Sequence, residues 1–199
     1  MPIFKLALVS VFYYASHSAL ASQRVKNWVA QKFPSLLSIY RLTYNLLAIL
    51  GLLCIAWIYH QTPGKNFFEL GLWGKSLGGI LIILGAVMAA LALKGYDWQA
   101  FLGTKQLPAQ QIDPSEPLVV TGLNAWVRHP LYTATILVLV GALIGSPKPS
   151  TLTVVFISLL YLRIGIYWEE KKLVERYGEA YERYRKGVAM LIPRFWKQK

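Results

Sequence analysis

The chain has 199 residues, 55% of them hydrophobic, and its mean hydropathy of +0.42 lies outside the range of ordinary soluble domains. The net charge of +12 comes from 21 Lys and Arg against 9 Asp and Glu. Most of these basic residues fall between apolar runs, which favours a membrane surface and argues against a nucleic-acid partner. The single cysteine, Cys54, excludes a disulfide framework and a Cys-based zinc site, and we expect no metal centre.

Five apolar stretches have the length of about 17 to 25 residues that a helix needs to cross a membrane. We expect them near residues 3–21, 42–59, 77–95, 130–146 and 151–168. Only SPKPS separates the last two, and its prolines end one helix and start the next, so these spans should form a tight antiparallel hairpin. The sequence therefore predicts an all-α, multispanning membrane helix bundle of about five transmembrane helices, in a single domain over residues 1–199.

The distribution of basic residues predicts the orientation of these spans. With the N-terminus outside, 16 of the 21 Lys and Arg lie in segments on the cytoplasmic side, and four lie outside. The C-terminal tail is then cytoplasmic. An alternative for the N-terminus is a cleaved signal peptide, because SALA precedes Ser22, although Tyr13, Tyr14 and His17 are unusual in such a segment.

The cytoplasmic tail predicts one amphipathic helix. Its apolar and aromatic residues are spaced by four, four, three and four positions, at Leu173, Tyr177, Tyr181, Tyr184 and Val188. Such a helix either lies on anionic lipid or folds back as a cover over a pocket, and the two are compatible.

Ionisable residues near membrane depth are costly and are therefore the candidates for a site. The predicted hairpin brings Arg128, His129 and Tyr132 close to Glu169 and Glu170. Each also has a plainer interpretation, since a basic residue there can serve as a headgroup anchor and the WEEKK stretch as a solvated helix end. Together they favour a site.

Two further ionisable residues lie within the apolar stretches. Arg163, Tyr167 and Glu170 share one helix face, whereas Glu169 points away from it, so the two acids should have different partners. His17 is either a hydrogen-bonded histidine between helices or a base. No dinucleotide, P-loop, zinc-protease or hydrolase motif is present.

The pairing of VRHPLY with EEKKLVERYGEAYERYRKGVAMLIP resembles the C-terminal region of the integral membrane methyltransferases that include isoprenylcysteine carboxyl methyltransferase and the phospholipid methyltransferases. Residues 118–194 carry this resemblance. In the first half, SHSALASQRVK, YRLTYN and DWQAFLGTKQL are similar to the small bacterial branch of methanethiol methyltransferase-like proteins and their denitrification-linked relatives. The resemblance implies an integral protein of the bacterial inner membrane.

The resemblance further implies S-adenosylmethionine as the methyl donor, bound in a cytoplasm-facing pocket. The residues that we expect to bind it are Leu118, Val119, Gly122, Arg128, His129, Pro130, Tyr132, Glu169, Glu170 and Tyr181. Arg128 and His129 suit the donor's carboxylate and the paired acids suit its ammonium or ribose, while an aromatic face such as that of Tyr132 suits a sulfonium. Ala134, where many relatives have glycine, departs from the pattern, as do Leu123 and Asn124.

We expect methyl transfer at the cytoplasmic membrane face, with membrane lipids around the protein. A small thiol is the first candidate acceptor, and a lipid amine or a prenylcysteine carboxylate is the second. Arg128, Glu170 and His17 are the candidate catalytic residues, although an in-line displacement needs no covalent nucleophile. The alternatives are an NADPH-dependent membrane reductase of the sterol type, and a non-catalytic membrane binding protein with the same fold.

Overall fold

A computed structural model of the protein describes residues 1–94 and 117–194. Within these ranges the chain is helical, and its one β-type pairing is an isolated bridge between Val127 and Ala189. The described residues divide into two compact units, one formed by residues 1–65 and the other by residues 66–94 and 117–194. The expectation of an all-α helix bundle is confirmed.

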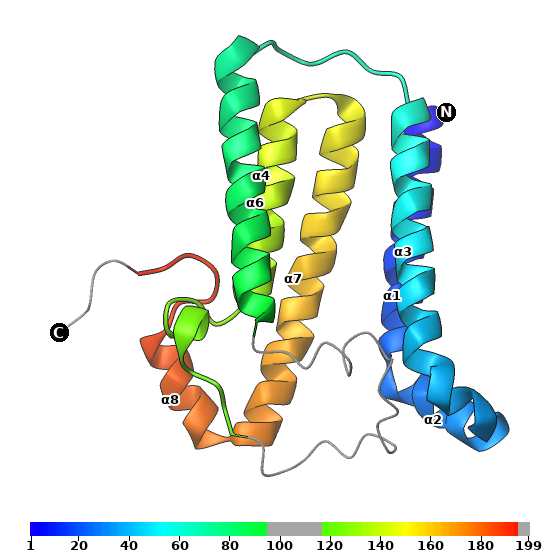
Figure 1. Ribbon diagram of the computed structural model, residues 1–199, viewed down its shortest axis with the longest axis vertical. Coiled ribbons are helices and arrows are strands. Elements are labelled where there is room, and N and C mark those ends of the chain that lie inside the picture. The colour runs from blue at the N-terminus through cyan, green and yellow to red at the C-terminus, as the bar shows by residue number, and fades with distance from the viewer. Residues whose placement is uncertain (95–116, 195–199) are drawn as a thin grey trace. The chain divides into compact units, whose positions relative to one another are not determined.

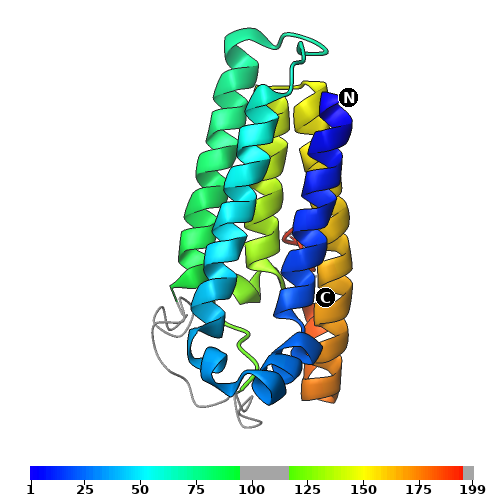
Figure 2. The same cartoon turned by 90° about the vertical axis from the view of Figure 1, so that its right-hand side faces the viewer.

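The first unit is a pair of long helices joined through short ones, in the order α1 (Pro2–Ala21), α2 (Gln23–Lys32), η1 (Pro34–Leu36) and α3 (Leu37–Gln61). Figure 2 shows α1 and α3 running side by side. The glycine at position 51 allows the ring of Tyr13 to lie directly against α3, where a β-carbon would clash with it. Ser22 caps α2, because its Oγ accepts a hydrogen bond from the Val25 amide at 3.4 Å.

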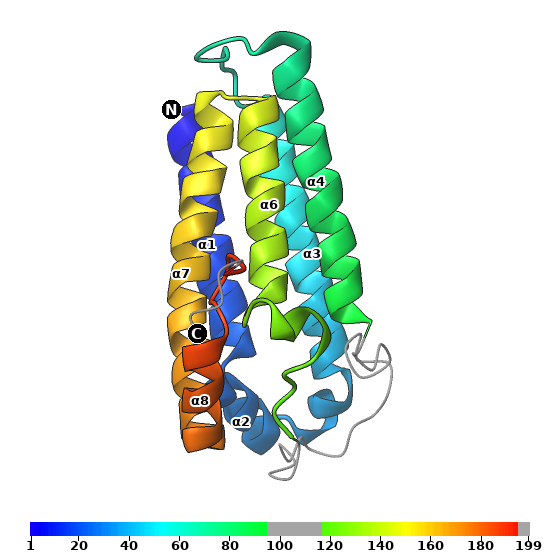
Figure 3. The same cartoon turned by 90° about the vertical axis from the view of Figure 1, so that its left-hand side faces the viewer.

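The second unit contains α4 (Gly71–Leu93), η2 (Gly122–Ala125), α6 (Pro130–Gly145), α7 (Pro149–Tyr177) and α8 (Glu179–Gly187). Figures 1 and 3 show α4, α6 and α7 standing beside one another, with α8 folded back at the lower end of α7. Glycines make the contact between α4 and α6 very close: a β-carbon on Gly78 would lie 2.6 Å from the carbonyl oxygen of Gly141. Such contact between small residues is typical of membrane helices.

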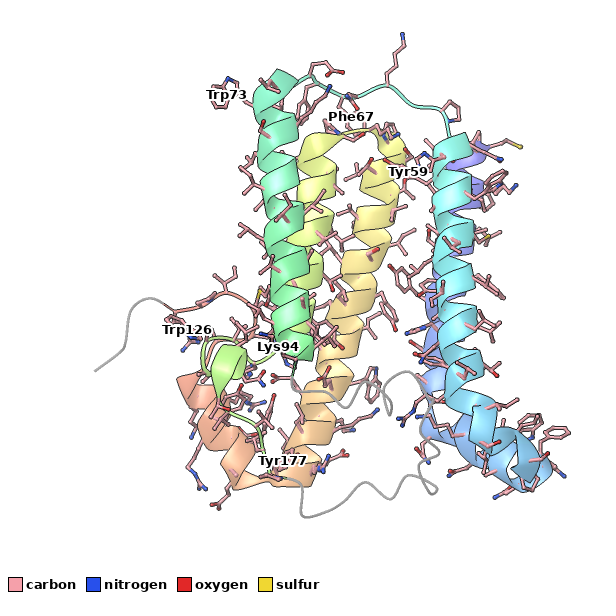
Figure 4. The ribbon with its side chains drawn as sticks, in the orientation of Figure 1. Tyr59, Phe67, Trp73, Lys94, Trp126 and Tyr177 are labelled. Atoms are coloured by element: carbon pink, nitrogen blue, oxygen red, sulfur yellow. The ribbon has the colours of Figure 1, made fainter. Side chains whose placement is uncertain are left out.

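The hairpin between α6 and α7 is confirmed. Pro130 and Pro149 begin the two helices, where proline has a favourable φ and lacks an amide that would stay unbonded. At the turn, the Phe67 amide donates to the carbonyl of Pro147 at 2.8 Å. Figure 4 shows Phe67 and Trp73 at this end of the second unit, and Lys94 and Tyr177 at the opposite end.

The spans differ in length from the expectation. Four helices, α1, α3, α4 and α7, are long and apolar enough to cross a membrane, whereas α6 is a shorter apolar helix of 16 residues. Helix α7, by contrast, has 29 residues and continues well past Trp168. It continues because the charged residues after Trp168 are good helix formers. Hydropathy alone does not measure helix propensity, so the expected span ended too early. Helix α2 was not predicted for the same reason.

The prediction of one continuous tail helix is wrong. The chain leaves α7 at Gly178, whose φ of 54° and ψ of −129° are open to glycine and strained for other residues, and a separate helix, α8, follows. The aromatic spacing continues across this break, so periodicity alone did not reveal it. The break turns α8 back along the end of α7, as the cover hypothesis requires.

Candidate active site

A buried carboxylate, Glu170, lies at the centre of the second unit's polar cluster. Its Oε1 atom accepts three hydrogen bonds, from Arg128 Nε at 2.8 Å, from His129 Nε2 at 2.9 Å and from the Tyr181 hydroxyl at 2.8 Å. The side chains of Arg128 and Glu170 are only 7% and 11% exposed. Charged groups removed from water in this way need such partners. The expectation that the hairpin brings Arg128 and His129 to Glu170 is confirmed.

Arg128 also holds the far end of α8. Its Nη1 donates to the carbonyl oxygens of Arg185 at 3.0 Å and Val188 at 2.7 Å, which lie in the last turn of α8 and just after it. These carbonyls have no partner within the helix, and they form the negative end of its dipole, so a cation stabilises them. Arg128 thus links the cover helix to Glu170.

His129 stands between the two acids. Its Nε2 contacts Glu170, and its Nδ1 lies 3.8 Å from Oε1 of Glu169. Glu169 also interacts with the hydroxyl of Tyr132, whose ring lies over Gly165 of α7. The prediction of different partners holds in part: the two acids share His129, but Tyr132 interacts with Glu169, and Arg128 and Tyr181 bind Glu170.

Backbone contacts fasten the tail to the start of α6. The amides of Arg128 and His129 donate to the carbonyls of Ala189 at 2.8 Å and Met190 at 3.2 Å. The hydroxyl of Thr133 donates to Leu191 O at 2.8 Å. No sequence pattern pointed to Thr133, because its role depends on how the tail folds back.

The loop before α6 is fastened to α8 as well. The Tyr184 hydroxyl donates to the carbonyl oxygen of Asn124 at 2.6 Å. Asn124 belongs to the stretch that departs from the resembling family, but here it contributes a backbone oxygen, which any residue supplies. The departure therefore leaves this contact intact.

Tyr181 completes the cluster and is almost fully buried, with 1% of its surface exposed. Burial, and then the hydrogen bond to the Glu170 carboxylate, raise the pKa of the Tyr181 phenol. Its hydroxyl consequently stays protonated at neutral pH and remains a donor to Glu170.

A cavity of about 470 Å³ opens beside this cluster, between α7, α8 and the tail. This volume lies within the range of about 300–1,000 Å³ that is usual for sites of small ligands. Seven of the lining residues come from α7 and three from α8 and the tail: Arg163, Ile166, Tyr167, Glu170, Lys171, Val174, Glu175, Glu182, Arg185 and Met190. The shared face of Arg163, Tyr167 and Glu170 is therefore confirmed, and it faces the cavity.

Most of the other lining residues were not predicted. On α7 the lining residues form adjacent pairs that repeat every four positions, at 166/167, 170/171 and 174/175, and this pattern becomes readable once the helix is known to continue to Tyr177. Glu182, Arg185 and Met190 required the fold of the tail.

Several predicted site residues lie elsewhere in the described chain. Leu118, Val119, Gly122 and Tyr132 are not among the residues that line the cavity, and Pro130 is the first residue of α6. Gly122 has a φ of 62° and begins η2. The DWQAFLGTKQL stretch falls outside the described residues.

His17 belongs to the first unit. Its Nε2 lies 2.8 Å from the hydroxyl of Tyr44, and its buried Nδ1 has no hydrogen-bond partner in the described part of the chain. His17 and the cluster around Glu170 belong to different units, and a catalytic role for His17 stays a prediction.

The fold and the cluster together define a multispanning helical membrane protein with a buried arginine–histidine–carboxylate cluster beside a cavity. Residues 5–193 match the family model described as NnrU protein, and the chain therefore belongs to this family.

Curated relatives carry methyltransferase names. The chain is 32% identical to a methanethiol S-methyltransferase of a Pseudomonas species, over 94% of this chain and 72% of that protein. It is 28% identical to the methanethiol S-methyltransferase of Mycobacterium tuberculosis, over 96% and 78% of the two chains. A more distant relative is the protein-S-isoprenylcysteine O-methyltransferase of Saccharomyces cerevisiae, 28% identical over 59% of this chain and 48% of that one. No solved structure matches the chain. These relatives support a methyltransferase.

Proposed function

We propose that this protein transfers a methyl group from S-adenosylmethionine to a small thiol, at the end of the helix bundle where α7, α8 and the tail meet. The observation that carries the proposal is the cavity beside Glu170 in a chain whose relatives are methyltransferases. The methanethiol enzymes among them favour a thiol over a lipid amine or a prenylcysteine carboxylate as the acceptor.

The residues around the cavity fit the donor's chemistry. Glu170 uses Oε1 for its three protein partners, and among the described residues no group occupies Oε2, so this oxygen remains for an ammonium or a ribose hydroxyl. Lys171 and Arg185 are cations on the cavity wall that suit a carboxylate. Tyr167 offers an aromatic face that suits a positively charged sulfur.

When bound, S-adenosylmethionine supplies a methyl group activated by its attachment to a sulfonium. The chain's own residues bind the donor, orient it and exclude water. Glu170 is held in place by Arg128, His129 and Tyr181, and a carboxylate fixed in this way needs little reorganisation when a ligand arrives. Arg128 thereby acts as a positioning residue, because its guanidinium binds Glu170 through Nε and the end of α8 through Nη1.

Helix α8 forms part of the wall of the cavity opposite α7. It contributes Glu182 and Arg185 to the wall, and it is held down by Tyr181, Tyr184 and Arg128. A wall on this side shields part of the site from water and strengthens the charge interactions there. The methyl acceptor, as a small lipophilic molecule, can reach the site from the surrounding lipid.

Calorimetric titration of the purified protein tests the donor. We expect S-adenosylhomocysteine to bind and NADPH not to bind, and Glu170→Gln to weaken the binding by about 1–3 kcal/mol, the scale of a charge-assisted hydrogen bond. Binding of NADPH in place of S-adenosylhomocysteine would establish the reductase alternative. Donor binding without methyl transfer to any acceptor would establish the non-catalytic one.

A further inference from the structure

A second charged residue of the cavity, Arg163, lies deeper in the apolar part of α7 than Glu170. The two are seven residues apart, which corresponds to about 10 Å along a helix of 1.5 Å rise per residue. Arg163 precedes Trp168 in a helix long and apolar enough to span the membrane, and it lines the cavity next to Ile166 and Tyr167.

Arg163 differs from the other cations of the cavity in lacking a counterpart. Arg185 pairs with Glu182, its Nη2 lying 2.8 Å from Oε2, and Lys171 lies over the ring of Trp168 with its Nζ 5.6 Å from the centroid. Among the described residues of its own unit, 66–94 and 117–194, the exposed Arg163 has no ion pair or hydrogen bond. An uncompensated arginine at such a depth is costly and is usually balanced by a partner or a ligand. The ligand expected there is an anion.

The donor's carboxylate is poorly placed to be that anion. The carboxylate and the ammonium of an α-amino acid share one carbon atom, so both must be bound in the same part of the cavity. The acids suited to the ammonium, Glu170 and Glu175, lie further along α7, in company with Lys171 and Arg185. Arg163 is left at the apolar end, on the side from which a lipophilic acceptor enters.

We infer that Arg163 binds the acceptor as its thiolate, an inference that rests on the proposed methyl transfer to a thiol. Thiols have a pKa of about 8.5 or higher and react as thiolates, and a nearby cation lowers that pKa. The effect of the cation is larger where apolar surroundings reduce the screening by water.

The reaction that follows is balanced by the groups named. The thiol gives its proton to water at the open side of the cavity. A lone pair of the thiolate sulfur then forms a bond to the methyl carbon, while the bond from that carbon to the sulfonium breaks and its electron pair remains on the donor's sulfur. The products are a neutral thioether and S-adenosylhomocysteine. Arg163 loses its anionic partner in the same step, which favours release of the thioether into the lipid.

The test compares Arg163→Gln, Arg163→Lys and Lys172→Gln in the full-length protein. Lys172→Gln removes one positive charge from α7 outside the cavity wall and serves as the control. The first measurement is the pKa of an alkanethiol bound to the protein with S-adenosylhomocysteine, followed by the ultraviolet absorbance of the thiolate. The second is the dependence of kcat/KM on the acidity of the thiol, and the third is the Kd of S-adenosylhomocysteine.

We expect the wild type and Lys172→Gln to lower the pKa of the bound thiol by about 1–3 units, the usual effect of an opposite charge within a few ångströms. Arg163→Gln should remove that shift and reduce kcat/KM at least tenfold for weakly acidic thiols, with a smaller loss for acidic ones. The Kd of S-adenosylhomocysteine should stay unchanged, and Arg163→Lys should restore much of the shift because it keeps the charge.

Two results would overturn the inference while leaving the proposed function standing. A weaker Kd for S-adenosylhomocysteine with an unchanged thiol pKa would assign Arg163 to the donor's carboxylate. No change in any of the three measurements would assign it to lipid headgroups. Failure of the wild-type protein to methylate any thiol would instead remove the proposed function, and this inference with it.

Discussion

Glu170 is the residue on which the candidate site depends, because one of its oxygens accepts hydrogen bonds from three side chains that come from two distant parts of the chain. Arg128 precedes α6, His129 caps the same helix, and Tyr181 lies in α8. Glu170 also lines the cavity. Glu170 therefore contributes to stability as well as to the proposed function. Substituting Glu170 and Arg128 singly and together separates these two contributions.

At the residue scale, we expect Arg128→Met to lower the free energy of unfolding by about 3–5 kcal/mol, because it leaves a buried carboxylate without its charged partner. The double variant Arg128→Met/Glu170→Gln should be less destabilised than the sum of the two single variants, since it removes the uncompensated charge. Thermal unfolding in detergent measures both. Strict additivity would mean that Arg128 and Glu170 contribute to stability independently, contrary to the 2.8 Å contact between them.

The sequence was sufficient to predict which residues form this cluster, but only some of the contacts between them. The short turn between α6 and α7 was sufficient to predict that Arg128 and His129 meet Glu170. The partners that the tail supplies, Tyr181 and the carbonyls of Arg185 and Val188, depend on a chain reversal at Gly178. The aromatic spacing continues across Gly178, so the sequence does not predict in which direction the chain turns there.

At the element scale, glycines bring α4 and α6 into close contact, at Gly78 with Gly141 and at Gly85 with Ala134. Gly141→Ala should lower the stability of the second unit by about 1–3 kcal/mol, the usual cost of overpacking. Its β-carbon would lie 2.7 Å from the backbone oxygen of Gly78, and neither helix backbone can move aside alone. Gly79→Ala is the matched control, because a β-carbon there meets nothing within 4 Å. Equal melting temperatures for the two variants would argue against this helix contact.

The turn at Gly178 provides a second test at this scale. Gly178→Ala should cost about 1–3 kcal/mol through backbone strain, since the position has a φ of 54° and a β-carbon would meet no neighbour. Gly187→Ala, where the φ is not positive and the space is open, should be nearly neutral. Because the strain loosens α8, limited proteolysis should cleave the Gly178 variant faster in the tail. Identical cleavage rates would show that the turn tolerates a side chain.

The spans themselves were predictable because their apolar length is a direct consequence of the thickness of a membrane. Their ends were less predictable. α7 continues nine residues beyond Trp168, to Tyr177, since helix propensity and the contacts with α8 maintain it where hydropathy falls. Four of the seven residues of α7 that line the cavity lie in that extension, which explains why Lys171, Val174 and Glu175 were missed.

At the scale of the whole molecule, the excess of basic residues predicts that the candidate site faces the cytoplasm. A Cys54→Ala background allows single cysteines to report the orientation. We expect Lys65→Cys to react with a membrane-impermeant maleimide added to intact cells and Lys186→Cys to react only after the membrane is opened. The reverse pattern would place the cavity outside, away from the supply of S-adenosylmethionine.

The most direct test of the account is methyl transfer by the purified full-length protein, with isotopically labelled S-adenosylmethionine and three competing acceptors: a small alkanethiol, a phospholipid amine and a prenylcysteine. We predict that the label appears mainly in the volatile thioether, and that Glu170→Gln reduces its rate at least tenfold, while Lys172→Gln leaves it unchanged. Label found chiefly in the phospholipid or the prenylcysteine would contradict the assignment of the acceptor. The absence of label from all three products would contradict methyl transfer itself.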